Sequence, residues 1–242
     1  MSKYRSSDKT SYILGISLIV EALLNVPKTI KLVYLSSKAN KNKELDKLLS
    51  LCKKYGIEVI EDDKVIDSLS LKENCYGIGV FEKYKTPLST DKHIVLYNFS
   101  DEGDLGTIFR SATSFDFKDI VLINSSVDIF NPKVIRSSMG SFFHLNIKEY
   151  KSFDDYFNEY KYNLYPFVSS GKTELSDCMF KTPYSIIIPQ KYNDLDKYFK
   201  EGYYIDFNNL DEICLSSLSS IVLNFAYHQN VNDKNISYKV QV

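Results

Sequence analysis

Two short segments combine residue types that can hold an anionic group at the start of a helix. Residues 101–112 read Asp-Glu-Gly-Asp-Leu-Gly-Thr-Ile-Phe-Arg-Ser-Ala, and residues 131–144 begin with Asn-Pro-Lys. Glycine at a helix entry lets backbone N–H groups approach a ligand, and the amino terminus of a helix favours anionic oxygens. A guanidinium further along the helix, here that of Arg110, can hold a phosphate or act on a ribose. The sequence therefore predicts a ligand site at these two turns.

Apolar runs alternate with helical periodicity along the whole chain, which is typical of an α/β protein. We expect two domains, residues 1–86 and 93–242, joined by the polar, proline-containing segment 86–92. Strands separated by helical crossovers predict a doubly wound parallel sheet in the second domain. The expected helices are 12–24, 40–55, 63–70, 105–115, 134–139 and 210–228, followed by a loose tail from residue 230. The expected strands are 30–35, 57–60, 77–82, 94–98, 119–124, 142–147, 164–168, 184–188 and 203–207.

The order of the two turns resembles motifs 1 and 2 of the SpoU/TrmH (SPOUT) family of RNA 2′-O-ribose methyltransferases. The positions that match motif 1 are Asp101, Gly103, Gly106, Arg110 and Ala112. Those that match motif 2 are Pro132, Lys133, Ser138 and Gly140. Residues 1–86 resemble the small α/β domain that binds the RNA substrate in some members. The second domain has no Gly-x-Gly-x-x-Gly after its first strand, which argues against a Rossmann dinucleotide site.

The resemblance implies a fold, a chemistry and a set of partners. It implies a C-terminal domain threaded into a trefoil knot, a homodimer, and methyl transfer from S-adenosylmethionine to ribosomal or transfer RNA. Arg110 would engage the ribose 2′-hydroxyl, Asp104 and Ser138 would position the ribose, and Lys133 would line the RNA side. A protonated arginine acts most easily through charge or with help from a phosphate. The structural alternative for Arg110 is an arginine that caps a loop or forms a salt bridge with Asp104.

The third family motif, which holds the cofactor, is altered in this chain. Pro189, Lys191 and Asp194 stand where the family has Gly, Glu and Gly. The later Ile-Pro-Met and Ser-Leu-Asn are replaced by residues 205–207 and 214–216. Proline has no backbone N–H, and each lost hydrogen bond costs about 1–3 kcal/mol. The cofactor residues implied by the resemblance are Ile188, Pro189, Ile205, Phe207, Leu215 and Ser216.

These departures leave two functions open. One is an RNA 2′-O-methyltransferase, with ribosomal RNA favoured by the extra N-terminal domain. The other is a non-catalytic RNA-binding or ribosome-assembly paralogue that has lost the cofactor. Asp104 itself replaces a family Asn and Glu102 a family Pro, which adds negative charge beside a site for phosphate.

Charge is unevenly distributed along the 242 residues. Residues 1–92 carry 16 Lys and Arg against 12 Asp and Glu, whereas the remainder carries 14 against 19. Lysines supply most of the sequence-independent affinity for RNA. We therefore expect four lysines of the first domain to contact RNA phosphates, and the alternative is a solvated lysine-rich surface. They are Lys41, Lys43, Lys53 and Lys54.

Cysteine and histidine usage excludes several protein classes. The four cysteines and three histidines are scattered, so neither a disulfide framework nor a metal site is expected. Unpaired cysteines favour a reducing, cytoplasmic compartment. The apolar run at residues 12–24 contains Glu21 and lacks a cleavage pattern, so we expect a core helix there and neither a signal peptide nor a membrane anchor.

Overall fold

A computed structural model describes residues 4–70, 75–168, 171–195, 197–205 and 214–239 of the chain. The fold divides into two compact units. The first comprises Met1–Tyr84 and Asp128–His144, and the second comprises Lys85–Val127 and Leu145–Val242. Residues 128–144, which the sequence assigned to the second domain, thus pack within the first unit. The predicted Phe207 lies outside the described residues.

The first unit is a four-stranded sheet with the order β1-β4-β2-β3. Strand β4 pairs antiparallel with both β1 and β2, and β2 pairs parallel with β3. The strands are β1 (Thr10–Leu14), β2 (Ile30–Leu35), β3 (Glu58–Glu61) and β4 (Gly77–Glu82). The helices are α1 (Ile16–Asn25), α2 (Lys43–Tyr55), α3 (Asp63–Leu69) and α5 (Pro132–Ser137), with 3₁₀ turns η1 (Pro27–Thr29) and η2 (Ser141–His144).

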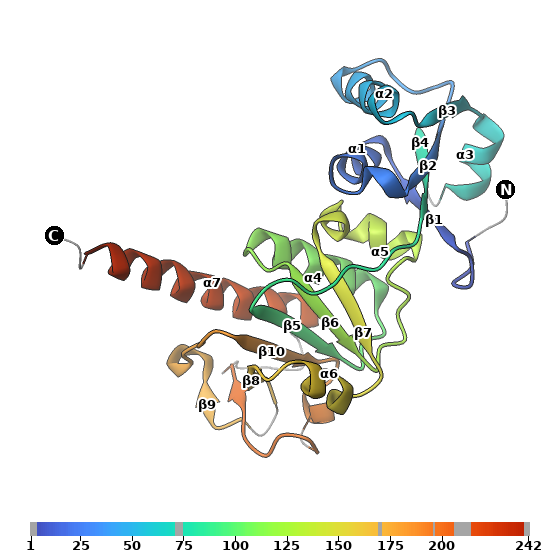
Figure 1. Cartoon of the computed structure of the whole chain (residues 1–242). Coiled ribbons are helices and arrows are strands. Elements are labelled where there is room, and N and C mark those ends of the chain that lie inside the picture. Colours follow the sequence, from blue (N-terminus) through green and yellow to red (C-terminus); the bar gives the residue numbers. More distant parts are fainter. Residues whose placement is uncertain (1–3, 71–74, 169–170, 196, 206–213, 240–242) are drawn as a thin grey trace. The chain divides into compact units, whose positions relative to one another are not determined.

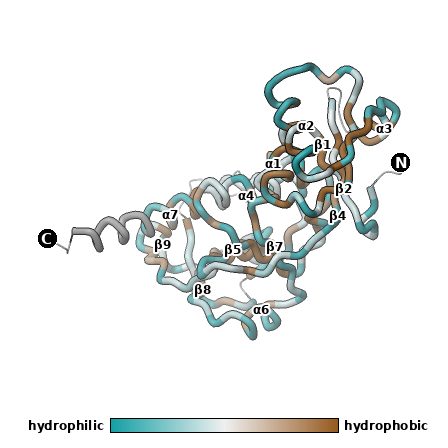
Figure 2. Tube along the Cα trace, turned by 45° about the horizontal axis from the view of Figure 1, so that its top comes forward, coloured by the Kyte–Doolittle hydropathy of each residue, from teal (hydrophilic) through white to brown (hydrophobic). Residues whose placement is uncertain are grey.

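Helices cover both faces of this first sheet (Figure 1). Helix α1 approaches β4 closely at two glycines, which have no side chain in the way. A Cβ added at Gly77 would lie 3.0 Å from Ile16, and one added at Gly79 would lie 3.2 Å from Ile19. The other face is a small core formed with α3 by Tyr12, Leu14, Ile66, Leu69, Ile78 and Val80. Figure 2 shows hydrophobic residues concentrated in α1 and the strands and hydrophilic ones around α2. This pattern explains why α2, rich in lysine, packs on α1 and leaves its charged side in water.

The second unit is built on a five-stranded sheet with the order β7-β6-β5-β10-β8, in which every pair is parallel. Its strands are β5 (Lys92–Tyr97), β6 (Asp119–Ile123), β7 (Asn146–Tyr150), β8 (Asn163–Pro166) and β10 (Tyr184–Pro189). A parallel pair joins β9 (Thr173–Glu174) to β11 (Tyr203–Tyr204). The helices are α4 (Glu102–Ser114), α6 (Phe153–Glu159) and α7 (Leu215–Lys239), with 3₁₀ turns η3 (Leu175–Asp177) and η4 (Tyr192–Leu195). The predicted α/β class with a parallel sheet is confirmed, and the trefoil knot stays a prediction.

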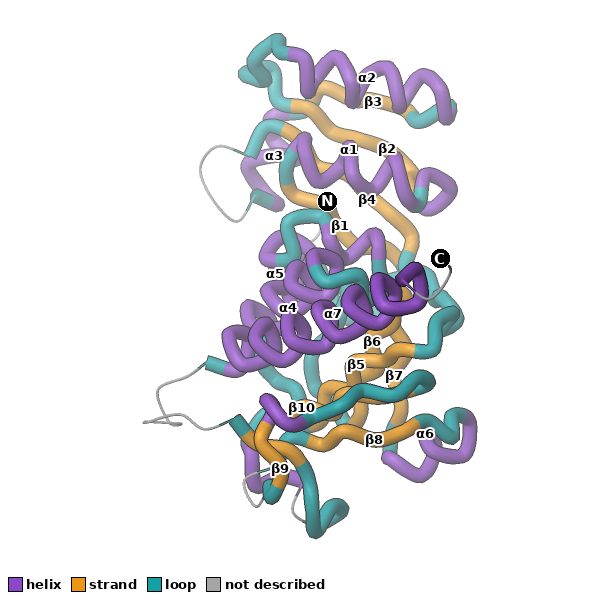
Figure 3. The backbone as a smooth tube through the Cα atoms, turned by 90° about the vertical axis from the view of Figure 1, so that its left-hand side faces the viewer, coloured by secondary structure: helices purple, strands orange, loops and turns teal. Residues whose placement is uncertain are grey.

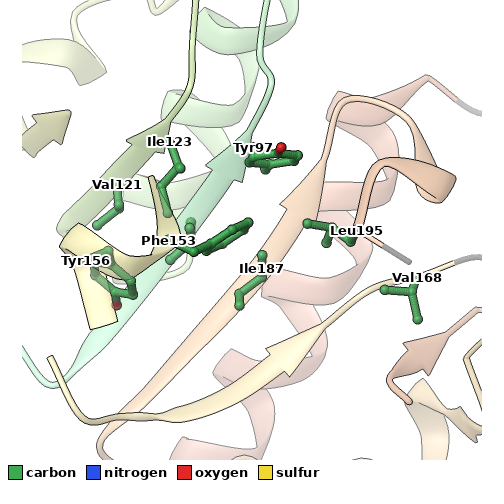
Figure 4. Packing of buried hydrophobic residues seen from close by; sticks show 9 residues of the cluster. Tyr97, Val121, Ile123, Phe153, Tyr156, Val168, Ile187 and Leu195 are labelled. Carbon is green, nitrogen blue, oxygen red and sulfur yellow. The ribbon is translucent and has the colours of Figure 1, made fainter. Parts of the chain in front are cut away.

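Helix α7 lies along α4 on one face of the second sheet, and α6 covers the other face (Figures 1 and 3). Beneath α6 the core is strongly aromatic, and Figure 4 shows Phe153 between Tyr97 and Ile187. The Phe153 and Tyr97 rings stack with centroids 4.9 Å apart. A core of this kind, buried from both sides, explains why β5, β6 and β10 read as continuous apolar runs.

Four sequence predictions about elements were wrong. The predicted helix at 12–24 is instead strand β1 and helix α1, separated at Gly15, whose φ of +122° ends the strand. The predicted strand at 142–147 is a 3₁₀ turn followed by β7, and α6 was missed. Helix α7 runs to Lys239, through the tail that we expected to be loose. Short apolar runs have no distinctive period, so only their packing decides between helix and strand.

The predicted linker is bound to the second unit. The Asp119 carboxylate accepts hydrogen bonds from the backbone N–H groups of Ser89 and Thr90, at 2.8 Å and 2.5 Å, and from the Asn146 side chain at 2.8 Å. Asp119 is fully buried. These bonds fix the segment that enters β5 against the amino ends of the neighbouring strands.

A buried histidine lies beside this carboxylate. His93 Nδ1 is 2.8 Å from the Tyr156 hydroxyl, which is 2.6 Å from Ser185 Oγ. His93 Nε2 has no hydrogen-bond partner among the described residues and is 3.9 Å from Asp119. Burial lowers the pKa of His93, and the opposing attraction of Asp119 does not offset this effect. His93 is therefore neutral in the folded protein near pH 7.

We expect the free energy of unfolding to fall as pH is lowered through 6.5, the usual histidine pKa. Below that pH His93 binds a proton in the unfolded chain but not in the folded one. The free energy of unfolding therefore keeps falling until the pH reaches the lowered pKa of folded His93. The slope from this residue is up to about 1.4 kcal/mol per pH unit. Urea unfolding of wild type and His93→Phe between pH 5 and 8 measures this slope as the difference between the two proteins. The variant is suitable because Tyr156 keeps its hydrogen bond to Ser185. An acid slope unchanged in His93→Phe would contradict the assignment.

Candidate functional site

The carboxyl ends of β5 and β10 meet the first turn of α4. The backbone N–H of Gln190, just after β10, donates to the Tyr97 carbonyl at 2.9 Å. The Gln190 side chain accepts from the Ser100 N–H at 3.2 Å. Asn98, between them, adopts a left-handed φ of +57° and donates to Asp194 at 3.1 Å. The loops after the two strands are thus bonded to one another at the edge where parallel α/β sheets bind ligands.

The first turn of α4 follows directly from these loops. Asp101 caps the helix, and its carboxylate accepts from the Asp104 N–H at 2.7 Å. Asparagine, aspartate and serine favour this position because they satisfy a backbone donor that the helix leaves open. The glycine of this turn, Gly103, is unobstructed, since an added Cβ would meet only the Asp101 carboxylate within 4 Å, at 3.3 Å. The motif 1 turn is therefore an ordinary capped helix start with open space above it.

Asp104 connects this turn to the start of α7. Ser216 Oγ donates to Asp104 Oδ1 at 2.8 Å, and two turns further along α4 Ser111 Oγ lies 2.7 Å from Ser220 Oγ. Both positions depart from the family motifs, Asp104 from Asn and Ser216 from Asn. Here a carboxylate acceptor faces a hydroxyl donor, so the two departures complement each other. The bond joins motif 1 to the predicted cofactor segment.

Arg110 lies six residues beyond Asp104 on α4, about 9 Å along the helix axis. Its side chain is exposed, and no described residue forms a hydrogen bond or salt bridge with its guanidinium. The structural alternative, a salt bridge between Arg110 and Asp104, is not present. All five N–H donors of the fork remain open to a ligand from solvent.

The predicted cofactor residues lie at three places in the second unit. Ile188 and Pro189 are buried at the end of β10, and Ile205 is half-buried just after β11. Leu215 and Ser216 form the first turn of α7. The hydrogen bonds through Gln190, Ser100 and Asp104 connect the β10 and α7 segments to the same turn of α4.

The backbone donors available to an adenosyl group differ from those of the family at the end of β10, and the start of α7 offers others. Pro189 supplies no N–H donor, and the Gln190 N–H is already bonded to Tyr97. The α7 turn offers replacements, since no described residue accepts from the N–H groups of Leu215 and Ser216. The first N–H groups of a helix have no partner within it. The open N–H donors at the start of α7 suit the polar atoms of an adenosyl group.

Cys214 adds a group that the sequence reasoning did not single out. Its thiol is exposed immediately before α7 and lies 3.0 Å from Ser217 Oγ and 3.4 Å from Ser216 Oγ. Hydrogen bonds from Ser216 and Ser217 lower the pKa of Cys214. Gln190 was also missed, and no sequence signal marks it, because its role depends on the neighbouring strand.

The motif 2 residues lie in the first unit. Asn131 caps α5 by accepting from the Lys133 N–H at 2.9 Å, and Lys133 is exposed. Ser138 is fully buried, and its hydroxyl donates to the Ile135 carbonyl at 2.7 Å. The prediction that Ser138 positions the ribose is therefore corrected, because a buried hydroxyl bonded to the backbone cannot reach a substrate. Ser138 closes the end of α5.

The four lysines predicted to bind RNA are all exposed on or beside α2. Lys53 and Lys54 occupy the last turn of the helix, where a cation also stabilises the helix dipole. Lys54 Nζ lies 5.1 Å from the centre of the Tyr55 ring. The solvated-surface alternative therefore also accounts for their positions.

Two further observations concern metals and membranes. Among the residues that the structure describes, no group of three or more His, Cys, Asp and Glu could hold a metal ion. In the same part of the chain, no helix has the length and apolar character that crossing a bilayer demands.

Comparisons with known proteins agree with both halves of the chain. Residues 12–78 match the family model "RNA 2'-O ribose methyltransferase substrate binding", and residues 91–189 match "SpoU rRNA Methylase family". Mouse mitochondrial rRNA methyltransferase 3 is 40% identical over 65 residues, which cover 26% of this chain and 16% of that protein. The Bacillus subtilis 23S rRNA (guanosine(2553)-2'-O)-methyltransferase RlmP is 36% identical over 61 residues, 25% of each chain. The aligned segments thus span no more than a quarter of these relatives.

Solved structures share the fold. The SpoU methyltransferase AviRb from Streptomyces viridochromogenes, in complex with AdoMet, matches with a TM-score of 0.79 at 17% identity, covering 92% of this chain and 91% of that one. An AdoMet-bound rRNA methyltransferase from Sinorhizobium meliloti matches with a TM-score of 0.74 at 18% identity, covering 91% and 87%. At such identities the likeness establishes the fold. With both family models matched in order along it, the chain belongs to the SpoU family of RNA methylases and carries the family's substrate-binding domain.

Proposed function

We propose that the protein transfers a methyl group from S-adenosylmethionine to a ribose 2′-hydroxyl of RNA, with ribosomal RNA as the substrate. The observation that carries the proposal is Arg110, which is exposed and unpaired among the described residues on the helix whose first turn is bonded to α7. A guanidinium in that position has no structural task in the described fold. Family membership supports the same chemistry over the non-catalytic alternative.

The reaction needs a stronger nucleophile than a neutral hydroxyl. S-adenosylmethionine supplies an electrophilic methyl group on a sulfonium sulfur. The S–CH3 bond breaks as the O–CH3 bond forms, and the 2′-hydroxyl proton leaves to a phosphate of the RNA or to water. The Arg110 guanidinium stabilises the negative charge that develops on the 2′-oxygen. Asp104 holds the start of α7 through Ser216 and so orients the two N–H donors there.

RNA contacts are assigned to the first unit and to motif 2. Lys41, Lys43, Lys53 and Lys54 would contact phosphates from the α2 surface, and Lys133 from the start of α5. Each neutralised phosphate contact releases counterions, so affinity should fall steeply with salt. A homodimer and a cytoplasmic location complete the proposal, and sedimentation of the purified chain tests the first of these.

Calorimetric titration with S-adenosylmethionine and with its demethylated product tests the enzyme proposal directly. Micromolar binding, together with transfer of a labelled methyl group to ribosomal RNA, is the expected result. Binding absent at millimolar ligand would leave the non-catalytic paralogue, which Pro189 favours because it removes a donor at the end of β10. Salt-sensitive RNA retention without methyl transfer would identify that alternative.

A further inference from the structure

A cavity of about 440 Å³ lies within the first unit, outside the methyl-transfer site described above. Its volume falls in the range of small-molecule pockets, about 300–1,000 Å³. Its lining includes Tyr4, Tyr12, Leu14, Asp67, Asn131 and Lys133. They come from the amino-terminal segment, β1, α3 and the start of α5. Three of them, Tyr12, Leu14 and Asp67, belong to the segment that matches the substrate-binding family model.

The cavity has a preorganised aromatic and apolar lining. Tyr12 and Leu14 are buried in β1, at 7% and 6% exposure. The Tyr4 hydroxyl donates to the Asp128 carboxylate, and Lys83 Nζ lies 4.8 Å from the centre of the Tyr4 ring. Lys83 also lies 3.7 Å from Asp128. The Tyr4 ring is thus held at its hydroxyl and over its face, which makes it a rigid surface for stacking.

Asp67 supplies a carboxylate to the lining of the cavity. It is exposed on α3, and no described residue forms a hydrogen bond or salt bridge with its carboxylate. It lies near the carboxyl end of α3, where the helix dipole disfavours a negative charge. A carboxylate offers two oxygens side by side and accepts two hydrogen bonds at once. Among the described residues, the Asp67 carboxylate is therefore open to accept hydrogen bonds from a ligand.

The combination of features selects one kind of ligand. Unpaired RNA bases are bound by stacking on aromatic side chains and by hydrogen bonds to their Watson–Crick edges. Guanine alone among the four bases presents two adjacent donors on that edge, N1–H and N2–H, which match a carboxylate. Adenine and cytosine place an acceptor beside their donor, and uracil places its single donor between two carbonyls. Lys133, exposed at the start of α5, supplies positive charge for a neighbouring phosphate.

We propose that this cavity receives one unstacked guanine of the substrate RNA, with its Watson–Crick edge on Asp67 and its ring against Tyr4. The inference rests on the proposed function, because it takes RNA to be the substrate. It adds a base-specific contact to a domain whose surface lysines recognise only phosphates. The first unit then selects the RNA segment as well as holding it.

Binding of short RNA to the full chain, without S-adenosylmethionine, tests the proposal. Two labelled single-stranded hexamers of uridine, one with a central guanosine and one with a central adenosine, are compared by fluorescence anisotropy. We expect wild type to bind the guanosine hexamer about tenfold more tightly. In Asp67→Asn that preference should disappear while affinity for the adenosine hexamer is unchanged. Asp46→Asn, an exposed carboxylate on α2, is the matched control and should keep the preference.

Each contrary result overturns the proposal in a recognisable way. Equal affinities in wild type, or a preference retained in Asp67→Asn, would show that the cavity does not read guanine. The melting temperature of Asp67→Asn checks its fold and should not fall, because the change removes a charge that the helix dipole disfavours. If GMP alone binds as tightly as the guanosine hexamer, the ligand is a free nucleotide and the RNA assignment is wrong. Methyl transfer to ribosomal RNA is measured separately, so that loss of guanine preference with intact transfer refutes only this inference.

Discussion

Replacing Arg110 by alanine is expected to lower the rate of methyl transfer by about 10²–10³-fold and to leave the fold intact. The guanidinium is exposed and has no described partner, so its removal breaks no structural contact. The rate falls because a preorganised charge at the developing oxyanion contributes this much in comparable sites. Transfer of a labelled methyl group to RNA, measured at saturating S-adenosylmethionine, gives the rate. Calorimetry should show cofactor affinity close to that of wild type.

Two further variants make this result specific. Arg110→Lys keeps the charge but loses the planar fork, so an intermediate rate is expected if geometry matters. Arg5→Ala removes another exposed arginine, in the first unit, and should change neither rate nor stability. Turnover that survives Arg110→Ala would remove Arg110 from the mechanism. Loss of cofactor binding in the same variant would assign it to the donor site.

Gly202→Ala is expected to have the largest effect on stability. An added Cβ would lie 2.6 Å from the Pro166 carbonyl oxygen and 2.7 Å from Val168 Cγ2, closer than real Cβ contacts. The Gly202 carbonyl also accepts from the Lys172 N–H at 3.0 Å, so the backbone cannot move away without losing a bond. Overpacking of this kind costs about 1–3 kcal/mol. In a chain of this size the melting temperature should fall by about 2–12 °C.

The same substitution should weaken cofactor binding. Gly202 immediately precedes β11, whose Tyr203 carbonyl accepts from the Val168 N–H at 3.1 Å, and Ile205 follows β11 directly. Displacing β11 therefore displaces a predicted cofactor residue. Gly103→Ala is the matched control for the melting temperature alone, because its Cβ meets only Asp101 at 3.3 Å and the position is helical. A melting temperature of Gly202→Ala equal to that of wild type would show that the β8–β11 contact adapts.

Local sequence signals predicted the elements that carry the chemistry. The helix predicted over residues 105–115 is α4, which begins three residues earlier than predicted, at Glu102. The strand Gly77–Glu82 was predicted with both its bounds. Capping residues and continuous apolar runs act within a few residues, so a single sequence contains this information. Residues 12–24 show its limit, because an apolar run interrupted by Gly15 fits a helix or a strand equally well.

Contacts between distant residues decided what each motif position does. Asp104 and Ser216 are 112 positions apart, and only the packing of α7 on α4 makes one the acceptor of the other. Ser138 has a hydroxyl of the kind that can bind a substrate, yet the packing of α5 buries it. The sequence by itself determined the family, the α/β order and the presence of a cation at position 110, since these depend on residue type and short-range spacing. The tertiary structure decided which polar groups are satisfied and which remain open to a ligand, because burial and hydrogen-bond partners depend on segments that meet only after folding.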